Sequence, residues 1–309
     1  MPFYGAKTRR PWLTRKRRTE ITPETLPPSS QRTGLITGAS SGFGLLTTIA
    51  LAKRGWRVLA TMRDLSRCER LEAAAKAAGV LERIELHALD VTDAAQIDTL
   101  AETLAAREVH ALVNNAGFAM AGFADDVGDA ELRSQFETNF FGAAAVTRAF
   151  LPQFRRQGAG HIVMLSSISG LMGFPGISSY CASKFALEGW AESLRFEMKP
   201  LGIQVVLVEP GSFETDIWTR GAILSAGTLD AQSSPNASRI ARWRARMQTA
   251  KPKANPQVVA DGIAAILENP RPRLRYVYGK DARMGLWLRR LLPFGASEWV
   301  VSKSSGMER

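Results

Sequence analysis

The stretch Thr37-Gly38-Ala39-Ser40-Ser41-Gly42-Phe43-Gly44 joins a short apolar run, residues 34–37, to a helical stretch, residues 44–54. Glycine at 38 permits a tight turn, glycine at 42 lets a ligand approach the backbone, and glycine at 44 lets the helix pack closely on the strand. A phosphate group would then lie at the positive end of the helix dipole. Three glycines also occur in ordinary turns, so it is the flanking strand and helix that indicate a phosphate-binding loop.

Short apolar runs alternate with longer amphipathic segments on the C-terminal side of this loop. Strands are predicted at residues 34–37, 57–61, 83–89, 111–113, 161–165, 204–208 and 274–278, and helices at 44–54, 68–78, 94–106, 130–155, 179–199 and 256–267. The predicted strands are apolar throughout rather than at alternate positions, which is typical of a parallel sheet covered on both faces. The sequence therefore predicts an α/β fold with a single doubly wound Rossmann-type parallel sheet of about seven strands and helices on both faces. An eight-stranded barrel is the alternative, but it needs one more strand and a different glycine motif.

Three segments depart from this alternation. Residues 1–32 are basic and then rich in Pro, Thr and Ser, which predicts a disordered arm ahead of the Rossmann-type domain at 33–280. Residues 212–255 form a long Ala/Ser/Arg-rich insertion, which we expect to be a substrate lid. Residues 281–309 form an amphipathic tail, expected either to pack on the domain or to lie on a membrane surface.

The chain is strongly basic. Its formal net charge is +11, and residues 7–18 hold a dense block of lysine and arginine. Such a block suits an acidic surface, a phosphorylated ligand or nucleic acid. We interpret it as a flexible solvated arm, keep peripheral membrane contact as an alternative, and do not expect nucleic-acid binding.

Cysteine and apolar content indicate the compartment. Cys68 and Cys181 are too few for a disulfide framework or a metal site, so we expect reduced thiols and no bound metal. No apolar run reaches the roughly 18–20 residues that a membrane span needs. The Arg9-Arg10 pair lacks the apolar segment of an export signal, so a cytoplasmic protein is expected.

The glycine spacing resembles that of the short-chain dehydrogenase/reductase superfamily, and further motifs agree in order over residues 33–267. These are Asn114-Asn115-Ala116-Gly117 after the fourth strand, Asn139 in the next helix, Ser167 after the fifth strand, Tyr180-Cys181-Ala182-Ser183-Lys184 in the following helix, and Pro210-Gly211 with Thr215 after the sixth strand. The resemblance implies an oxidoreductase that acts on a small-molecule alcohol or carbonyl compound, and a homo-oligomer.

The catalytic set is predicted from the Tyr-x-x-x-Lys pair. Tyrosine has an ordinary pKa near 10, too high for a base at neutral pH. Lys184 lies one helical turn after Tyr180, so its ammonium is expected to favour the phenolate and lower that pKa. The resemblance implies that Ser167 holds the substrate oxygen and that Asn139 positions a water between Lys184 and solvent. An isolated pair of this kind is usually an ordinary helical contact, so the prediction depends on the other motifs.

The cofactor is predicted to be NADP(H) rather than NAD(H). An acidic residue at the end of the second strand would repel a 2′-phosphate, and this sequence has Met62 followed by Arg63 there. A guanidinium can form a forked bond to phosphate. Asp64 is expected to cap the next turn, and Asp90 either to contact adenine or to cap the helix at 94. The predicted cofactor contacts are Gly38, Ser40, Ser41, Gly42, Phe43, Gly44, Arg63, Asp90, Val91, Asn115, Ala116, Gly117, Tyr180, Lys184, Pro210, Gly211 and Thr215.

The segments at 170–175 and 180–189 resemble those of estradiol 17β-dehydrogenases and retinol dehydrogenases, which implies a lipophilic alcohol/ketone pair. Six apolar residues are expected to line its pocket, although Leu171 and Met172 suit the core equally: Leu171, Met172, Phe174, Phe213, Ile217 and Trp218. The alternatives are a non-catalytic NADP(H)-binding regulator, a membrane or nucleic-acid binder using the basic arm, and a sugar epimerase of the extended superfamily. The first should lack part of the Ser/Tyr/Lys set, and the last should have another glycine spacing.

Overall fold

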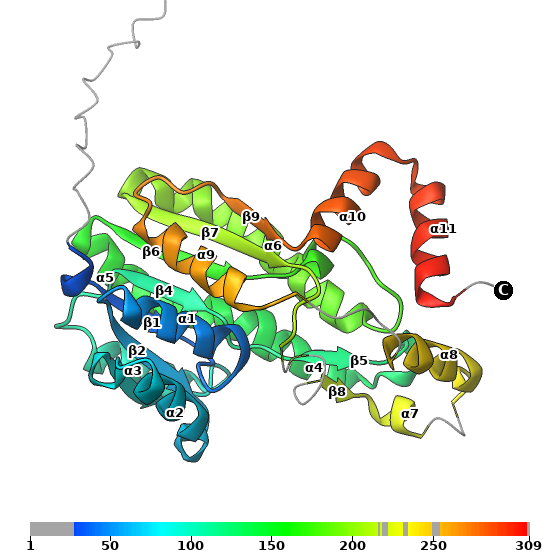
Figure 1. Cartoon of the computed structure of the whole chain (residues 1–309), viewed down its shortest axis with the longest axis horizontal. Helices are drawn as coiled ribbons and strands as arrows, with labels where there is room; N and C mark the ends of the chain where they lie inside the picture. The colour runs from blue at the N-terminus through cyan, green and yellow to red at the C-terminus, as the bar shows by residue number, and fades with distance from the viewer. Residues whose placement is uncertain (1–27, 216, 218–221, 231–233, 249–253, 308–309) are drawn as a thin grey trace, which may run out of the picture.

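A single open parallel sheet organises the chain (Figure 1). The computed structural model describes residues 28–215, 217, 222–230, 234–248 and 254–307, so the predicted arm up to residue 27 and Trp218 lie outside it. The sheet holds seven strands in the order β3-β2-β1-β4-β6-β7-β9, all parallel. Its strands are β1 (Thr33–Ile36), β2 (Arg57–Met62), β3 (Ile84–Ala88), β4 (Ala111–Asn114), β6 (Gly160–Leu165), β7 (Ile203–Pro210) and β9 (Arg275–Tyr278). All seven predicted strands are confirmed, and the two free edges exclude a closed barrel.

Helices cover both faces of the sheet (Figure 1). One face is covered by α1 (Gly42–Lys53), α2 (Glu69–Ala77) and α9 (Gln257–Glu268). The other is covered by α3 (Ala94–Thr103), α5 (Ala143–Gln157) and α6 (Ser178–Met198). Each layer buries a separate apolar cluster, because the strands present Val, Ile and Leu to both sides.

The strand order reverses between β1 and β4. From β1 the chain winds outward to β2 and β3, and then returns to β4 on the other side. In such sheets the loops at the carboxyl ends of the two strands diverge and leave a crevice for a ligand. The glycine loop follows β1 and the Asn-Asn-Ala-Gly segment begins at the end of β4, so both lie at this crevice.

The helix predicted at 130–155 has an interruption. It consists of α4 (Asp129–Phe136), a π-helical turn at Glu137–Gly142, and α5. A π turn inserts an extra residue into the helix and is frequent at functional sites. Gly142 lets this turn pack closely on Val91, since a Cβ at this position would lie 2.7 Å from Cγ2 of Val91.

The segment after β4, the insertion at 212–255 and the tail contain elements that the sequence pattern did not indicate. Two three-residue strands, β5 (Ala119–Ala121) and β8 (Ala222–Leu224), pair in parallel, and the short helices α7 (Ala226–Leu229) and α8 (Ala237–Gln248) follow. The tail forms two helices, α10 (Lys280–Leu291) and α11 (Phe294–Ser305), separated at Pro293. Among the described helices, none combines the length and the apolar character that a membrane span needs.

The arm joins the domain earlier than its composition suggested. Residues 29–31 form a 3-10 turn beside Gly55, and the Arg32 guanidinium stacks 5.4 Å from the Trp56 ring centroid. These contacts place the last residues assigned to the arm within the folded domain.

Candidate active site

The glycine loop forms a cradle at the start of α1. Gly38 and Gly42 have φ angles of +69° and +55°, in the left-handed region that favours glycine. A Cβ on Gly44 would lie 2.3 Å from the Gly38 carbonyl oxygen, so only glycine fits there. A Cβ on Gly42 would meet only Thr215, at 4.0 Å, so the space beside this residue is open. No side chain caps the helix at Ser41, and its first N–H groups remain available to a phosphate. The cradle fits a dinucleotide pyrophosphate.

Asn115 holds the glycine loop in place. Its Nδ2 donates to the Thr37 and Gly38 carbonyl oxygens at 2.8 and 2.9 Å. The Thr37 hydroxyl in turn accepts from the backbone N–H groups of Asn115 and Ala116, both at 3.0 Å. Two of the predicted cofactor contacts therefore have a local positioning function, and exposed Gly117 follows them at the crevice.

Two predicted nucleotide contacts lie in the loops after β2 and β3. Arg63 is exposed directly after Met62, and Asp64 accepts from the Ser66 N–H at 3.0 Å, which confirms its predicted capping function. Asp90 accepts from the Thr92 N–H at 2.9 Å. It does not cap the helix at 94, however, because Asp93 caps α3. The prediction of Asp90 as that cap was wrong by one turn.

Ser167, Tyr180 and Lys184 meet at the carboxyl end of β6, and all three are buried. Ser167 follows the strand, and its hydroxyl hydrogen-bonds the Tyr180 phenol. Lys184 lies one turn after Tyr180 on α6. Its Nζ donates to the Leu165 carbonyl at 2.7 Å and lies 5.8 Å from the Tyr180 ring centroid. The neighbouring Ser166 points elsewhere, since its hydroxyl lies beside Glu188. The structure therefore distinguishes Ser167 from Ser166.

Burial controls the titration of this cluster. It raises the pKa of Tyr180 to about 12, and the hydrogen bond from Ser167 offsets only part of the shift. Burial also lowers the pKa of Lys184 to about 8. The sequence predicted a lowered pKa for Tyr180, and in the protein alone the direction is the opposite, because desolvation disfavours the phenolate.

Asn139 lies in the π turn and faces the same region. Its Oδ1 accepts from the Phe118 N–H at 3.1 Å, and its Nδ2 donates to the Phe118 carbonyl at 3.0 Å and to the Ser183 hydroxyl at 3.2 Å. Ser183 immediately precedes Lys184, so these bonds tie the segment after β4 to α6. No sequence motif indicated the contribution of Ser183.

The loop after β7 reaches the glycine loop, since Thr215 lies beside Gly42. Pro210 ends the strand, and the Gly211 N–H donates to the Tyr278 carbonyl at 2.8 Å. Phe213 packs edge-on against Phe43 with ring centroids 5.8 Å apart, in the core cluster under α1. Phe213 was expected in the substrate pocket, and that prediction was wrong, because the ring belongs to this core.

An apolar wall lies against Tyr180. Phe174, Ile217, Leu224 and Trp243 pack on the buried cluster that contains Tyr180 and Cys181. Trp243 was not anticipated, although it is the only aromatic residue of an otherwise basic helix, α8. Met172 is buried beneath α10, near Gly285, so it belongs to the core.

A largely buried ionic cluster joins α6, β7 and β9, and it was also missed. Arg275 of β9 donates to Glu209 at 2.8 Å and to Glu192 at 2.6 Å, and it also pairs with Glu188. Burial raises the pKa of Glu188, and it raises the pKa of Glu209 to about 7. Glu188 lies one turn after Lys184, and this spacing was the available signal.

The comparisons with known proteins agree with this geometry. The family model described as short chain dehydrogenase matches residues 32–222. YusZ, an uncharacterized oxidoreductase of Bacillus subtilis (strain 168), is 40% identical over 278 residues, 89% of this chain and 98% of that protein. Human retinol dehydrogenase 8 is 37% identical over 258 residues, 80% of this chain and 81% of that protein. The crystal structure of a short-chain dehydrogenase from Streptomyces avermitilis is 36% identical with a TM-score of 0.73, covering 90% of this chain and 99% of that one. The chain therefore belongs to the short-chain dehydrogenase/reductase family and has the family's nucleotide-binding oxidoreductase fold.

Proposed function

We propose that this protein is an NADP(H)-dependent oxidoreductase that interconverts an alcohol with a ketone or aldehyde, with Tyr180 as general acid and base. The observation that carries the proposal is the buried cluster of Ser167, Tyr180 and Lys184 beside a cradle that fits a dinucleotide. When bound, the nicotinamide cofactor supplies or accepts the hydride. A non-catalytic regulator is the alternative, and no observation favours it, because all three residues are present.

Each residue has a defined task in this proposal. The hydroxyls of Ser167 and Tyr180 are hydrogen-bonded to each other and can both bond one substrate oxygen. Tyr180 donates its proton to that oxygen during reduction and accepts it during oxidation. The Lys184 ammonium, held by the Leu165 carbonyl, stabilises the phenolate. Asn139 is proposed to position a water between Lys184 and solvent, and its bond to the Ser183 hydroxyl places it beside Lys184 in the sequence of α6.

The preference for NADP(H) is supported by Arg63. Family members 25% identical to this chain have been solved with NADP, from a metagenomic source, and with NAD, from Burkholderia phymatum, so the fold accepts either. Arg63 is exposed and has no ion pair among the described residues, while Asp64 caps its own turn and lies 3.6 Å from Arg67. The Arg63 guanidinium is therefore available to a 2′-phosphate.

We expect Arg63→Ala to weaken NADPH binding by about 10- to 100-fold, the loss of one or two hydrogen bonds to a charged group. NADH binding should change little, because that cofactor has no 2′-phosphate. The measurement is the dissociation constant for each cofactor by fluorescence titration. Arg67→Ala is the matched control, since Arg67 is exposed in the same loop. An unchanged NADPH/NADH ratio in Arg63→Ala would refute this role.

A lipophilic substrate is supported by the apolar wall of Phe174, Ile217 and Trp243 against Tyr180 and by the similarity to retinol dehydrogenase 8. We expect purified protein to oxidise NADPH with retinal, a steroid ketone or a long-chain ketone, and more slowly with small polar sugars. The measurement is the loss of NADPH absorbance over the panel, with Ser167→Ala as the inactive control. Turnover of sugars without turnover of any lipophilic ketone would contradict the substrate class.

The insertion at 212–255 is proposed to act as the substrate lid. Its helix α8 carries Trp243, which packs on the apolar cluster that contains Tyr180. Asn236 fixes the start of α8, since its Nδ2 donates to Asp125 at 2.8 Å and to Asp126 at 3.1 Å. Arg239 stacks 4.4 Å from the Phe123 ring centroid. These bonds anchor the insertion to the segment after β5 and support a cover over the substrate pocket.

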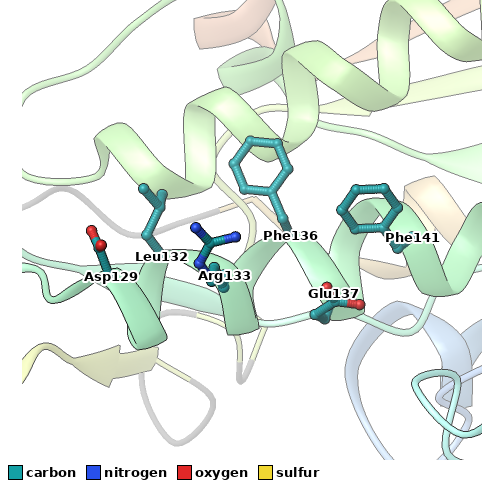
Figure 2. Close-up of a pocket in the computed structure, with 6 residues that line it drawn as sticks. All are labelled: Asp129, Leu132, Arg133, Phe136, Glu137 and Phe141. Carbon is teal, nitrogen blue, oxygen red and sulfur yellow. The ribbon is translucent and has the colours of Figure 1, made fainter.

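A homo-oligomer is proposed through the surface of α4 and the π turn. Figure 2 shows a shallow pocket there, in which Leu132, Phe136 and Phe141 lie beside charged neighbours. Phe141 is 51% exposed, and Phe185 of α6 is 42% exposed. Exposed aromatic groups of this kind mark protein–protein contacts. A cytoplasmic location is proposed as well, supported by the two free cysteines.

A further inference from the structure

Helix α10 has two opposite faces. Its inner face consists of Ala282, which is buried, Gly285, whose Cβ would lie 3.5 Å from the Met172 sulfur, and Arg289, which donates to the Leu171 carbonyl. Met284 and Trp287 lie on the other face and are 61% and 62% exposed. Leu291, one turn on from Trp287, is exposed too. The spacing i, i+3, i+7 places these three residues on one side of the helix.

This arrangement inverts the usual pattern. A surface helix normally turns its apolar stripe toward the core and its charges toward water. Here a small residue, a glycine and an arginine contact the domain, while Met284, Trp287 and Leu291 are exposed. Helix α11 adds Phe294 and Trp299, 81% and 59% exposed. We call Met284, Trp287, Leu291, Phe294 and Trp299 the apolar tail face. So many exposed large apolar side chains in two consecutive helices mark an interaction surface.

The charges around the apolar tail face are mainly positive. Between residues 280 and 307, all described, the basic residues are Lys280, Arg283, Arg289, Arg290 and Lys303, and the acidic ones are Asp281 and Glu298. The Asp281 carboxylate is already used, since it accepts from the Ser212 N–H at 2.7 Å. The Lys303 ammonium lies 4.7 Å from the Trp299 ring centroid. Tryptophan beside long basic side chains is typical of the boundary between lipid headgroups and acyl chains.

We propose that the apolar tail face docks onto an anionic lipid surface. The apolar side chains would enter the headgroup region while the surrounding lysine and arginine bind lipid phosphates. A second copy of the chain fits less well, because a two-fold contact would bring the same positive charges together. The inner face of α10 contacts the loop that contains Leu171 and Met172, shortly after Ser167, so one helix separates this loop from the docking surface. Docking would therefore hold the loop after Ser167 one helix away from a lipid surface, although the proposal stands without the proposed function.

The test is co-sedimentation of the full chain with vesicles of phosphatidylcholine and phosphatidylglycerol, compared with phosphatidylcholine alone. We expect binding to the mixed vesicles and quenching of tryptophan fluorescence by brominated acyl chains. The variant Trp287→Ser/Leu291→Ser/Phe294→Ser should bind the mixed vesicles at least about tenfold more weakly than the wild type, because it removes most of the apolar area available for burial. Phe196→Ser/Val258→Ser, which alters two exposed apolar residues on α6 and α9, should bind like the wild type.

Several outcomes would overturn the proposal. One is wild-type protein that stays in solution with both vesicle types. Another is a triple variant that binds as tightly as the wild type, because the basic block at 7–18 is unchanged in it and would then account for binding. A third is a lower molecular mass of the triple variant in sedimentation velocity without lipid, which would assign the face to a second copy. If the triple variant does not fold, absence of quenching in the wild type overturns the proposal on its own.

Discussion

Replacing Tyr180 with phenylalanine is expected to reduce kcat/KM by about 10²- to 10⁴-fold, the usual contribution of a positioned acid or base. The change removes one hydroxyl and keeps the ring, which packs with Ala119, Ile177 and Cys181. The fold and the glycine loop should therefore be unaffected. Dinucleotide binding, measured by fluorescence titration, should stay within a few-fold of the wild type.

The pH profile separates a proton-transfer role from a packing role. Oxidation of an alcohol needs the phenolate of Tyr180, so its rate should rise with pH. Reduction of a ketone needs the neutral phenol, so its rate should fall at high pH. Burial raises the pKa of Tyr180 to about 12 in the protein alone, and the charges of Lys184 and of the oxidised cofactor would lower it again. Tyr180→Phe should lose both limbs of the profile.

The adjacent serines provide the control for Tyr180→Phe. Ser167→Ala should lose activity as well, since Ser167 hydrogen-bonds the phenol. Ser166→Ala should keep most activity, because the Ser166 hydroxyl lies beside Glu188 instead. Turnover by Tyr180→Phe at the wild-type rate, with dinucleotide bound, would remove the proposed mechanism and leave only a nucleotide-binding scaffold.

The sequence predicted the parts of the fold whose local pattern matches their environment. Continuous apolar runs indicated the seven strands, because strands buried on both faces need apolar side chains at every position. The short β5 and β8 strands were missed, since the Ala-rich β5 segment has weak strand propensity and both strands have only three residues. The tail was predicted as one amphipathic segment, but it forms two helices, and Pro293 marks the break between them.

The site was predictable at residues that belong to ordered motifs, and much less so elsewhere. The motifs gave Ser167, Tyr180 and Lys184, which the fold brings together. They did not show that Asn115 bonds the glycine loop, because a hydrogen bond across 77 or 78 positions leaves no local pattern. Trp243 was missed for the same reason, since it packs on the apolar cluster that contains Tyr180 only through the placement of α8 in the fold.

The ionic cluster at Arg275 illustrates the same limit and leads to the largest expected change in stability. Glu188 and Glu209 are almost fully buried, and Arg275 pairs with both. Removing one partner of a buried ion pair leaves an uncompensated charge, which typically costs about 3–5 kcal/mol. Arg275→Met should therefore lower the free energy of unfolding by about that amount. The measurement is urea denaturation at pH 7, compared with Arg273→Met, which alters an exposed arginine near the start of the same strand and should change stability by about 0.5 kcal/mol or less.

Substitution of the two buried carboxylates tests whether unpaired charge or altered packing explains the loss of stability in Arg275→Met. If the cost comes from unpaired buried charge, Glu188→Gln and Glu209→Gln should each restore part of the stability of Arg275→Met, although each should destabilise the wild type.

The cluster also sets a pH dependence. The pKa of Glu209 is raised from its ordinary value to about 7, so the folded protein holds a proton that the unfolded chain releases. That contribution is complete below the ordinary pKa and is lost as pH rises through about 7. Stability of Arg275→Met should fall more steeply over the same interval, because ionised Glu209 then lacks its only cation among the described residues. Two results together would reject the electrostatic explanation and assign the loss of stability to packing. The first is that Arg275→Met loses the same free energy of unfolding at pH 5 and at pH 8, and the second is that neither Glu188→Gln nor Glu209→Gln restores it.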